Sequence, residues 1–213
     1  MIAPGAGKNP SDPTDIGWNP AWNAELPADA PALAEAVACD PVYQTWTPSP
    51  GDNEHRPMSC IDWFEAFAFC VWDGGRLPTE GEWDYATIGG SEYRTFPWGE
   101  AAPDCTYANF IPDQMRCAAT FTNDVGSESP KGDGKWGQAD LAGNLWEWVL
   151  DWSSNNIALG CANCAHPPPS SPWRVVRGGS FGSDATYLGH QARFEMVPWI
   201  RDAVTRARCA RNP

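Results

Sequence analysis

Hydrophobic residues recur at helical spacing between residues 62 and 72, where they fall on one face. That face carries Trp63, Ala66, Phe67 and Cys70. A repeat of three and four residues is typical of an amphipathic helix. Ser59 is the expected cap, with Asp62 in the position of its capping-box partner. The pattern therefore predicts a capped helix over residues 62–72 that turns its apolar face to the core.

Two further helices are predicted by their end signals. Thr79 followed three residues later by Glu82 allows each side chain to cap the backbone of the other, so a helix begins there. The pair Gly89-Gly90 ends it, because glycine is favoured just after a helix. Residues 29–37 contain the run Ala-Leu-Ala-Glu-Ala-Val, which predicts a short helix that stops before Pro41.

Alternating Trp and Val residues predict three short strands, at residues 145–152, 174–181 and 206–211. Residues 1–28 are rich in Pro, Gly, Asn and Asp and show no such period. We expect them to form an extended arm that Trp18 and Trp22 hold against the body. Residues 29–213 then form one domain, since single domains often reach about 200 residues.

Composition adds loops and acidity to this picture. The chain of 213 residues contains 21 Pro and 20 Gly, so turns and loops should make up much of it. Its net charge of −13 would repel nucleic acids and anionic membranes. The excess of carboxylates also supplies the oxygen ligands that calcium prefers. No apolar run reaches the roughly 20 residues of a membrane span, and the opening reads as though an export signal and a first strand had preceded it.

The cysteine content predicts an oxidising compartment. The eight cysteines are Cys39, Cys60, Cys70, Cys105, Cys117, Cys161, Cys164 and Cys209. An even number is compatible with four disulfides, which are typical of secreted, cell-surface or periplasmic proteins. Cys161 and Cys164 also have the spacing of half a zinc site, but only His166 lies near them and no second close pair follows. We therefore favour a small disulfide loop over zinc.

Four segments and a closing motif together resemble the formylglycine-generating, or sulfatase-modifying factor, family. In chain order they are Gly-Arg-Leu-Pro-Thr-Glu-Gly-Glu-Trp at 75–83, Phe-Pro-Trp-Gly at 96–99, Ala-Gly-Asn-Leu-Trp-Glu-Trp at 142–148, Arg-Gly-Gly-Ser-Phe at 177–181 and Arg-Cys-Ala at 208–210. Any one segment has low specificity, but their order across residues 57–213 is highly specific. The chain is thus identified as similar to this family.

The resemblance implies an α+β fold of the variant C-type-lectin-like type, with two main helices, a small twisted antiparallel sheet and many loops. It also implies a disulfide between Cys70 and Cys209, which would stabilise the fold by about 4 to 5 kcal/mol because it closes a long loop. With that pair taken, the other six cysteines are paired by elimination. The pairs are Cys39 with Cys60, Cys105 with Cys117, and Cys161 with Cys164.

Calcium is implied by the same resemblance. The matching residues are Asp140 and Glu147, through their carboxylates, and Gly143 and Leu145, through their backbone carbonyls. Two carboxylates around a Gly-Asn turn suit a cage of about six to eight oxygens. The alternative is that both carboxylates only cap turns. A second calcium site is implied at Asn109 and the Phe110 carbonyl.

The catalytic cysteine pair of the family has no counterpart in this sequence. The resemblance implies copper(I) bound by two thiolates shortly after Arg-Gly-Gly-Ser, yet residues 182–193 contain no cysteine. Copper(I) requires soft ligands, so we expect no copper-dependent oxidation of a substrate cysteine. The alternative is an oxidoreductase with another metal, such as the non-heme iron of a related branch. His55, His166 and His190 lack the spacing of an iron site.

A binding function is the remaining prediction. The expected groove combines aromatic and polar side chains, which suit a peptide, protein or glycan ligand. Its residues are Phe181, Asp184, Tyr187, His190, Arg193 and Trp199, with Trp173 as an alternative to Phe181. Variable loops on a lectin-like scaffold in retroelement-diversified receptors give this interpretation a precedent by resemblance. We therefore predict a secreted or surface, calcium-stabilised binding or assembly module.

Overall fold

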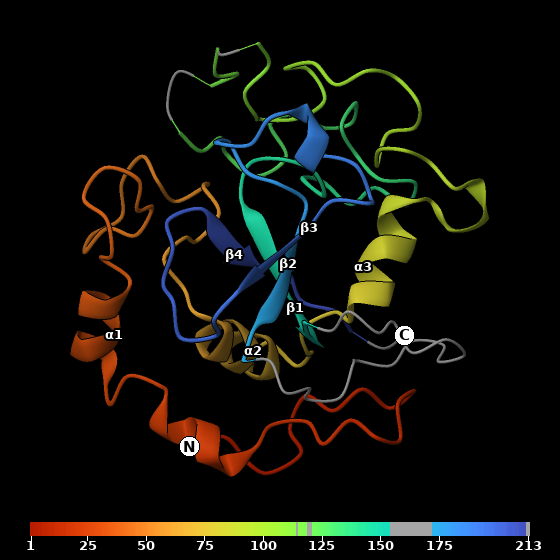
Figure 1. Cartoon of the computed structure of the whole chain (residues 1–213). Helices are drawn as coiled ribbons and strands as arrows, with labels where there is room; N and C mark the ends of the chain where they lie inside the picture. Colours follow the sequence, from red (N-terminus) through yellow and green to blue (C-terminus); the bar gives the residue numbers. More distant parts are fainter. Residues whose placement is uncertain (114, 119–120, 154–171, 212–213) are drawn as a thin grey trace.

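A small sheet of four strands forms the centre of the computed structural model, which describes residues 1–113, 115–118, 121–153 and 172–211. The strands are β1 (Trp146–Trp152), β2 (Arg174–Arg177), β3 (Arg193–Met196) and β4 (Thr205–Ala207). Their order across the sheet is β3-β2-β1-β4. Figure 1 shows this sheet between α2 and α3, with long loops at the upper end.

The sheet is mixed, so the expectation of a purely antiparallel sheet is wrong. β2 pairs antiparallel with both β1 and β3, whereas β4 pairs parallel with β1. The reason lies in the segment between β3 and β4, which runs back past the start of α2 before β4 begins. The Pro198 carbonyl accepts the N–H of Trp63 there, and the Asp202 carbonyl accepts the N–H of Cys60. β4 therefore enters the sheet from the same end as β1.

The three helices are α1 (Ala30–Ala36), α2 (Trp63–Trp72) and α3 (Glu80–Thr87), close to their predicted positions. Thr79 and Glu82 form the expected capping box. At α2 the cap is Asp62 with Glu65 as its partner, so the expected Ser59 cap is wrong. The Ser59 hydroxyl instead accepts the backbone N–H of Thr45. Short 3-10 turns occur at η1 (Pro20–Ala24), η2 (Gly90–Glu92) and η3 (Ala185–Tyr187).

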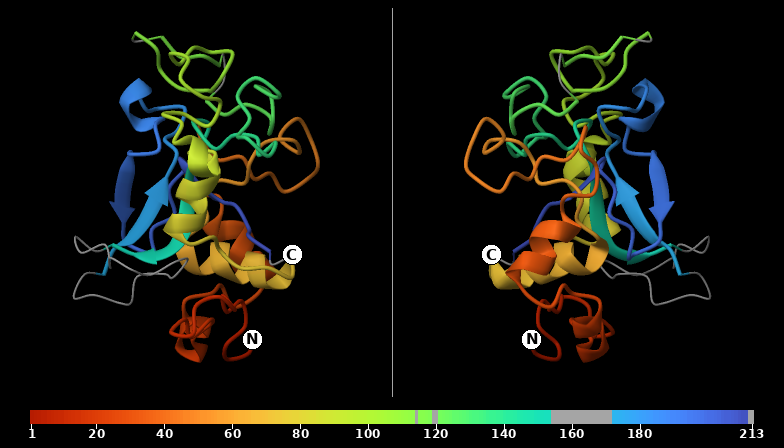
Figure 2. Two further views of the ribbon diagram at one scale, coloured as in Figure 1. Left: turned by 90° about the vertical axis from the view of Figure 1, so that its right-hand side faces the viewer. Right: turned by 90° about the vertical axis from the view of Figure 1, so that its left-hand side faces the viewer.

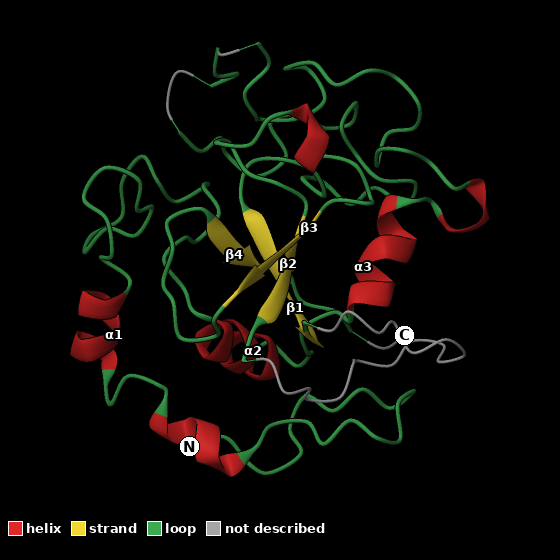
Figure 3. Cartoon of the chain, in the orientation of Figure 1, coloured by secondary structure: helices red, strands yellow, loops and turns green. Residues whose placement is uncertain are grey.

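Strand lengths differ from expectation where the backbone turns. β2 stops at Arg177 because Gly178 and Gly179 follow with φ values of +94° and +75°. β3 was not expected, because its four residues alternate between charged and apolar and form only a short edge strand. Figure 3 shows how much of the chain is loop around these elements.

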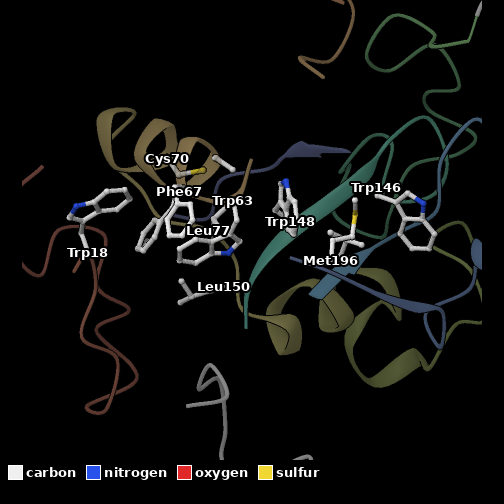
Figure 4. Packing of buried hydrophobic residues seen from close by; sticks show 12 residues of the cluster. Trp18, Trp63, Phe67, Cys70, Leu77, Trp146, Trp148, Leu150 and Met196 are labelled. Carbon is white, nitrogen blue, oxygen red and sulfur yellow. The ribbon is translucent and has the colours of Figure 1, made fainter. Parts of the chain in front are cut away.

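β1 contributes to a hydrophobic core on each face of the sheet, because its successive side chains point to opposite sides. Trp148 packs with Trp63 and Phe67 of α2 in the larger core, which Figure 4 shows from close by. Val149 packs with Trp83 of α3 in a smaller core on the other face. No helix among the described residues is both long and apolar enough to cross a membrane.

The N-terminal residues lie beneath α2 in both views of Figure 2. Trp18 is 1% exposed and meets the ring of Phe67 edge-on at a centroid distance of 5.5 Å. Trp22 meets Trp63 in the same way at 5.2 Å. These two indoles therefore pack the N-terminal residues against α2.

Three predicted disulfides are confirmed. They join Cys39 to Cys60, Cys70 to Cys209 and Cys105 to Cys117. The Cys70–Cys209 bond ties α2 to the segment that follows β4. Cys161 and Cys164 lie outside the described residues, so their disulfide and the zinc alternative both stay predictions.

Candidate functional site

Glu147, one of the expected calcium ligands, lies at the centre of a buried group of charges. Its side chain is 1% exposed. Its Oε1 atom accepts from Arg206 Nη2 at 2.6 Å and from Arg208 Nη2 at 2.9 Å. Its Oε2 atom accepts from Arg208 Nε at 3.0 Å and from Trp83 Nε1 at 2.9 Å. Both carboxylate oxygens are therefore fully used by protein donors.

The sheet explains why these groups meet. β1 and β4 run parallel, and Glu147 is the register partner of Arg206. Arg208 follows two residues later on the same side of the strand, because side chains alternate. Burial alone would raise the pKa of Glu147, but the guanidinium groups of Arg208 and Arg206 outweigh it and hold that pKa below its usual value.

Asp140 completes this group, which we call the ion cluster (Trp83, Asp140, Glu147, Arg206 and Arg208). Arg206 Nη2 donates to the Asp140 backbone carbonyl, and Arg206 Nη1 lies 3.5 Å from Asp140 Oδ2. That Oδ2 atom also accepts the backbone N–H of Gly126 at 3.0 Å. Two carboxylates and a backbone carbonyl thus converge on one guanidinium group.

This arrangement does not fit a calcium ion at Asp140, Gly143, Leu145 and Glu147. Calcium needs about six to eight oxygen ligands, and here the oxygens of Asp140 and Glu147 face two guanidinium groups instead. Gly143 itself has a structural role, since its φ is +75° and a Cβ there would lie 2.5 Å from the Asn109 carbonyl. Calcium binding by these four residues stays a prediction. The ion pairs that Asp140 and Glu147 make with arginine argue against it.

The second expected calcium site keeps one unused oxygen. Asn109 is buried, and its Nδ2 donates to the Phe121 carbonyl at 3.0 Å. Its Oδ1 has no hydrogen-bond partner among the described residues. The Phe110 carbonyl accepts the N–H of Cys117 at 3.0 Å. An unpartnered buried acceptor fits an ion or a water molecule, so calcium at Asn109 and Phe110 stays a prediction.

The segment after Arg-Gly-Gly-Ser presents aromatic rings. Tyr187, in η3, is 40% exposed and meets the ring of Trp146 edge-on at 5.8 Å. Phe194, in β3, is 51% exposed and lies 6.0 Å from the same ring. We call these three residues the aromatic face. Nearby Asp184 caps η3, and its hydrogen bonds from Thr186 lower the pKa of its carboxyl group.

The other expected groove residues lie elsewhere. His190 Nδ1 is 3.6 Å from Asp84 Oδ1, and Arg193 Nε donates to Glu80 Oε1 at 2.9 Å. Both partners belong to α3, on the side of the sheet opposite Phe194, because neighbouring residues of β3 alternate between faces. The structure therefore separates Tyr187 from His190 and Arg193.

Two aromatic residues of the expected groove differ sharply in exposure. Phe181 is buried and stacks on Tyr43 at 6.0 Å, with Phe121 tilted against it at 5.7 Å. Trp199 is well exposed. Sequence reasoning missed Trp146 and Phe194, since Trp146 lies within a motif and Phe194 on an unexpected strand. The alternation of apolar and charged residues at 193–196 was the available signal.

A cavity of about 440 Å³ opens between α1, α2 and β4. Its rim carries exposed apolar side chains such as Leu33, Met58 and Phe69. Glu147 and Arg208 line it as well, and 29% of the Arg208 side chain is exposed. The volume lies within the range of small-molecule sites. Among the described residues, no group of three or more His, Cys, Asp or Glu side chains is placed to hold a metal.

Comparisons with known proteins identify the family of this chain. The family described as "Sulfatase-modifying factor enzyme 1-like domain" matches residues 36–213. The chain is 29% identical to a formylglycine-generating enzyme of Thermomonospora curvata, over 95% of this chain and 75% of that protein. It is 32% identical to the Bos taurus formylglycine-generating enzyme over 73% of this chain, and it spans 46% of that protein's length. A hercynine oxygenase of Mycobacterium tuberculosis is 30% identical over 73% of this chain and 36% of its own.

Solved structures show the same fold. PvdO from Pseudomonas aeruginosa aligns with a TM-score of 0.61 and 20% identity, over 75% of this chain and 62% of that one. Treponema denticola variable protein 1 aligns with a TM-score of 0.61 and 23% identity, over 83% of this chain and 78% of that one. At these identities the likeness establishes the architecture alone.

Proposed function

The chain belongs to the sulfatase-modifying factor enzyme 1-like domain family, and we propose that it acts there as an extracytoplasmic binding or assembly module without copper-dependent formylglycine-generating activity. Its relatives include formylglycine-generating enzymes and a hercynine oxygenase. Its architecture is the α+β, C-type-lectin-like fold of that family.

The missing thiolates support the loss of the copper reaction. Residues 182–193 contain no cysteine. In the part of the chain that the structure describes, every cysteine is in a disulfide. Copper(I) is selected by soft thiolate ligands, which the hydroxyl and carboxylate groups of this segment cannot replace. Oxidation of a substrate cysteine through a copper dithiolate is therefore not expected.

The disulfides support an extracytoplasmic location. Bonds such as Cys70–Cys209 persist in oxidising compartments, whereas the cytosol keeps most thiols reduced. The proposed location is the periplasm, the cell surface or the exterior.

The observation that carries the binding function is the aromatic face. Its Tyr187 belongs to residues 182–193, the segment in which the family's thiolates would lie. Tyr187 and Phe194 leave large parts of their rings open to solvent. Such rings stack on apolar faces of sugars and on side chains of peptides. Asp184 adds a nearby carboxylate, and the net charge of −13 disfavours nucleic acid as the ligand.

Binding to glycan and peptide arrays tests this proposal. A Tyr187→Ala, Phe194→Ala double variant should weaken binding about tenfold or more, which corresponds to about 1.4 kcal/mol. Trp72→Ala is the matched control, because Trp72 is an exposed aromatic residue on α2, outside the aromatic face. Equal binding by the double variant and the wild type would contradict the proposal.

Metal analysis of the purified protein distinguishes the binding module from the alternative, an oxidoreductase that uses another metal. Stoichiometric copper or iron would favour an oxidoreductase and would contradict the binding module. A protein free of both metals would support the proposal.

A further inference from the structure

The guanidinium group of Arg206 lies in a set of oxygens that a hard cation would use. Within hydrogen-bonding or ion-pair distance are Glu147 Oε1, the Asp140 carbonyl and Asp140 Oδ2. The Arg206 side chain is only 6% exposed, so water cannot supply the charge compensation that these carboxylates need.

The charges in this set already balance. Two carboxylates, of Asp140 and Glu147, face two guanidinium groups, of Arg206 and Arg208. A divalent cation added here would leave an excess of positive charge in a buried place, at a high electrostatic cost. The position of Arg206 is also fixed by the backbone, because β4 pairs with β1 directly at Glu147.

We propose that the guanidinium group of Arg206 takes, between Asp140 and Glu147, the place that the resemblance gives to a calcium ion. The Arg206 side chain thereby connects β4 to the turn before β1, which carries Asp140. This inference concerns how the fold is held together and is independent of ligand binding at the aromatic face.

Removal of this guanidinium should open a cation site. An Arg206→Ala variant would leave Asp140 and Glu147 carboxylate oxygens and a backbone carbonyl around an empty space. Such hard oxygen donors suit calcium, whose coordination is flexible, better than magnesium, which demands a near-ideal octahedron. Arg208 would still cover part of the Glu147 carboxylate, so the new site lies on the side of Asp140.

Thermal unfolding of wild type and Arg206→Ala, each in calcium and in chelator, tests the proposal. Wild type should gain no stability from calcium at Asp140 and Glu147, so any shift that it shows comes from calcium at Asn109. The variant should unfold at a lower temperature in chelator, and calcium at a hundredfold excess over its dissociation constant should raise its midpoint by about 5 to 10 °C. Magnesium should raise it less. Any calcium bound at Asn109 contributes equally to both proteins and cancels in the comparison.

Two variants serve as controls. Arg76→Ala removes another buried arginine, but its partner is the single carboxylate of Glu82, at 2.5 and 2.6 Å. It should lose stability without any calcium response of its own. Asp140→Asn removes one carboxylate and keeps a residue that tolerates the observed φ of +56°. Because no calcium sits there, it should leave the response of wild type to calcium unchanged.

The outcomes separate cleanly. A calcium response in wild type as large as that of Arg206→Ala, or a wild-type response abolished by Asp140→Asn, would overturn the proposal. An Arg206→Ala protein that folds only in calcium would support it. If Arg206→Ala folds neither in calcium nor in chelator, the comparison of Asp140→Asn with wild type tests the proposal instead.

Discussion

Trp146 and Glu147 are neighbours in β1, yet they belong to regions of opposite character. Glu147 points into the ion cluster, where protein donors use both of its carboxylate oxygens. Trp146 supports the aromatic face, where Tyr187 and Phe194 remain open to solvent. The alternation of side chains along one strand therefore separates the ion cluster, which holds the fold, from the face that we propose for binding.

The two regions should respond very differently to substitution. Loss of one partner from a buried ion pair leaves an uncompensated charge, at a cost of about 3 to 5 kcal/mol. Substitutions of exposed residues without special contacts usually change stability by about 0.5 kcal/mol or less.

Glu147→Gln should reduce the free energy of unfolding by about 3 to 5 kcal/mol, because Arg206 and Arg208 lose their shared carboxylate. Urea unfolding at neutral pH measures this loss. Glu92→Gln is the control, since Glu92 pairs with Arg94 and Lys135 at the surface. Exposed ion pairs contribute little, so stability should change far less there. Equal losses of stability in the two variants would contradict the distinction between buried and exposed charges.

A second buried group of charges sharpens the comparison, because carboxylates outnumber guanidinium groups in it. Asp62 and Glu65 share the single guanidinium group of Arg201, at 2.9 Å from each. Burial, and then the charge of Glu65, raise the pKa of Asp62 from 3.8 to about 7. Glu147, between two guanidinium groups, has a lowered pKa instead.

The pH dependence of stability should follow these opposite shifts. Because the folded state raises the pKa of Asp62, its contribution is full below pH 3.8 and is lost as the pH rises through about 7. The contribution of Glu147 has the opposite sign and is lost as the pH falls through its lowered folded pKa. Urea unfolding of Asp62→Asn, which keeps a good helix cap, should show a smaller fall in stability across that interval than wild type. Identical slopes would contradict the assignment to Asp62.

The smallest expected effect lies at the aromatic face. Tyr187→Ala should lower the free energy of unfolding by less than about 1 kcal/mol, since it loses one edge-on ring contact of an exposed residue. Chemical denaturation measures this change. A loss as large as that of Glu147→Gln would show that Tyr187 is a core residue rather than a binding residue.

Local signals in the sequence were enough for the helices, whereas the Cys70–Cys209 pair came from the family resemblance and the other disulfides followed by elimination. The Thr79 capping box and the apolar spacing of α2 depend on neighbouring residues, so they could be read directly. The parallel pairing of β4 could not, because it depends on how the segment after β3 passes the start of α2.

The candidate sites show the same limit. The motif identified Asp140 and Glu147 as neighbouring carboxylates. The cationic group between them is the guanidinium of Arg206, whose strand is far from the motif in the sequence but pairs with β1. Likewise the groove residues 184–193 are close in sequence, yet η3 and β3 turn Tyr187 and Arg193 to different sides. Both arrangements depend on pairing between residues that are far apart in the sequence, which no local pattern predicts.

An assay for copper-dependent conversion of a peptide cysteine to formylglycine tests the central claim most directly. The Thermomonospora curvata enzyme would serve as the positive control. With copper(I), oxygen and a reductant supplied, this chain should bind no stoichiometric copper and should form no product above the protein-free background. Catalytic turnover that depends on stoichiometric copper would contradict the account.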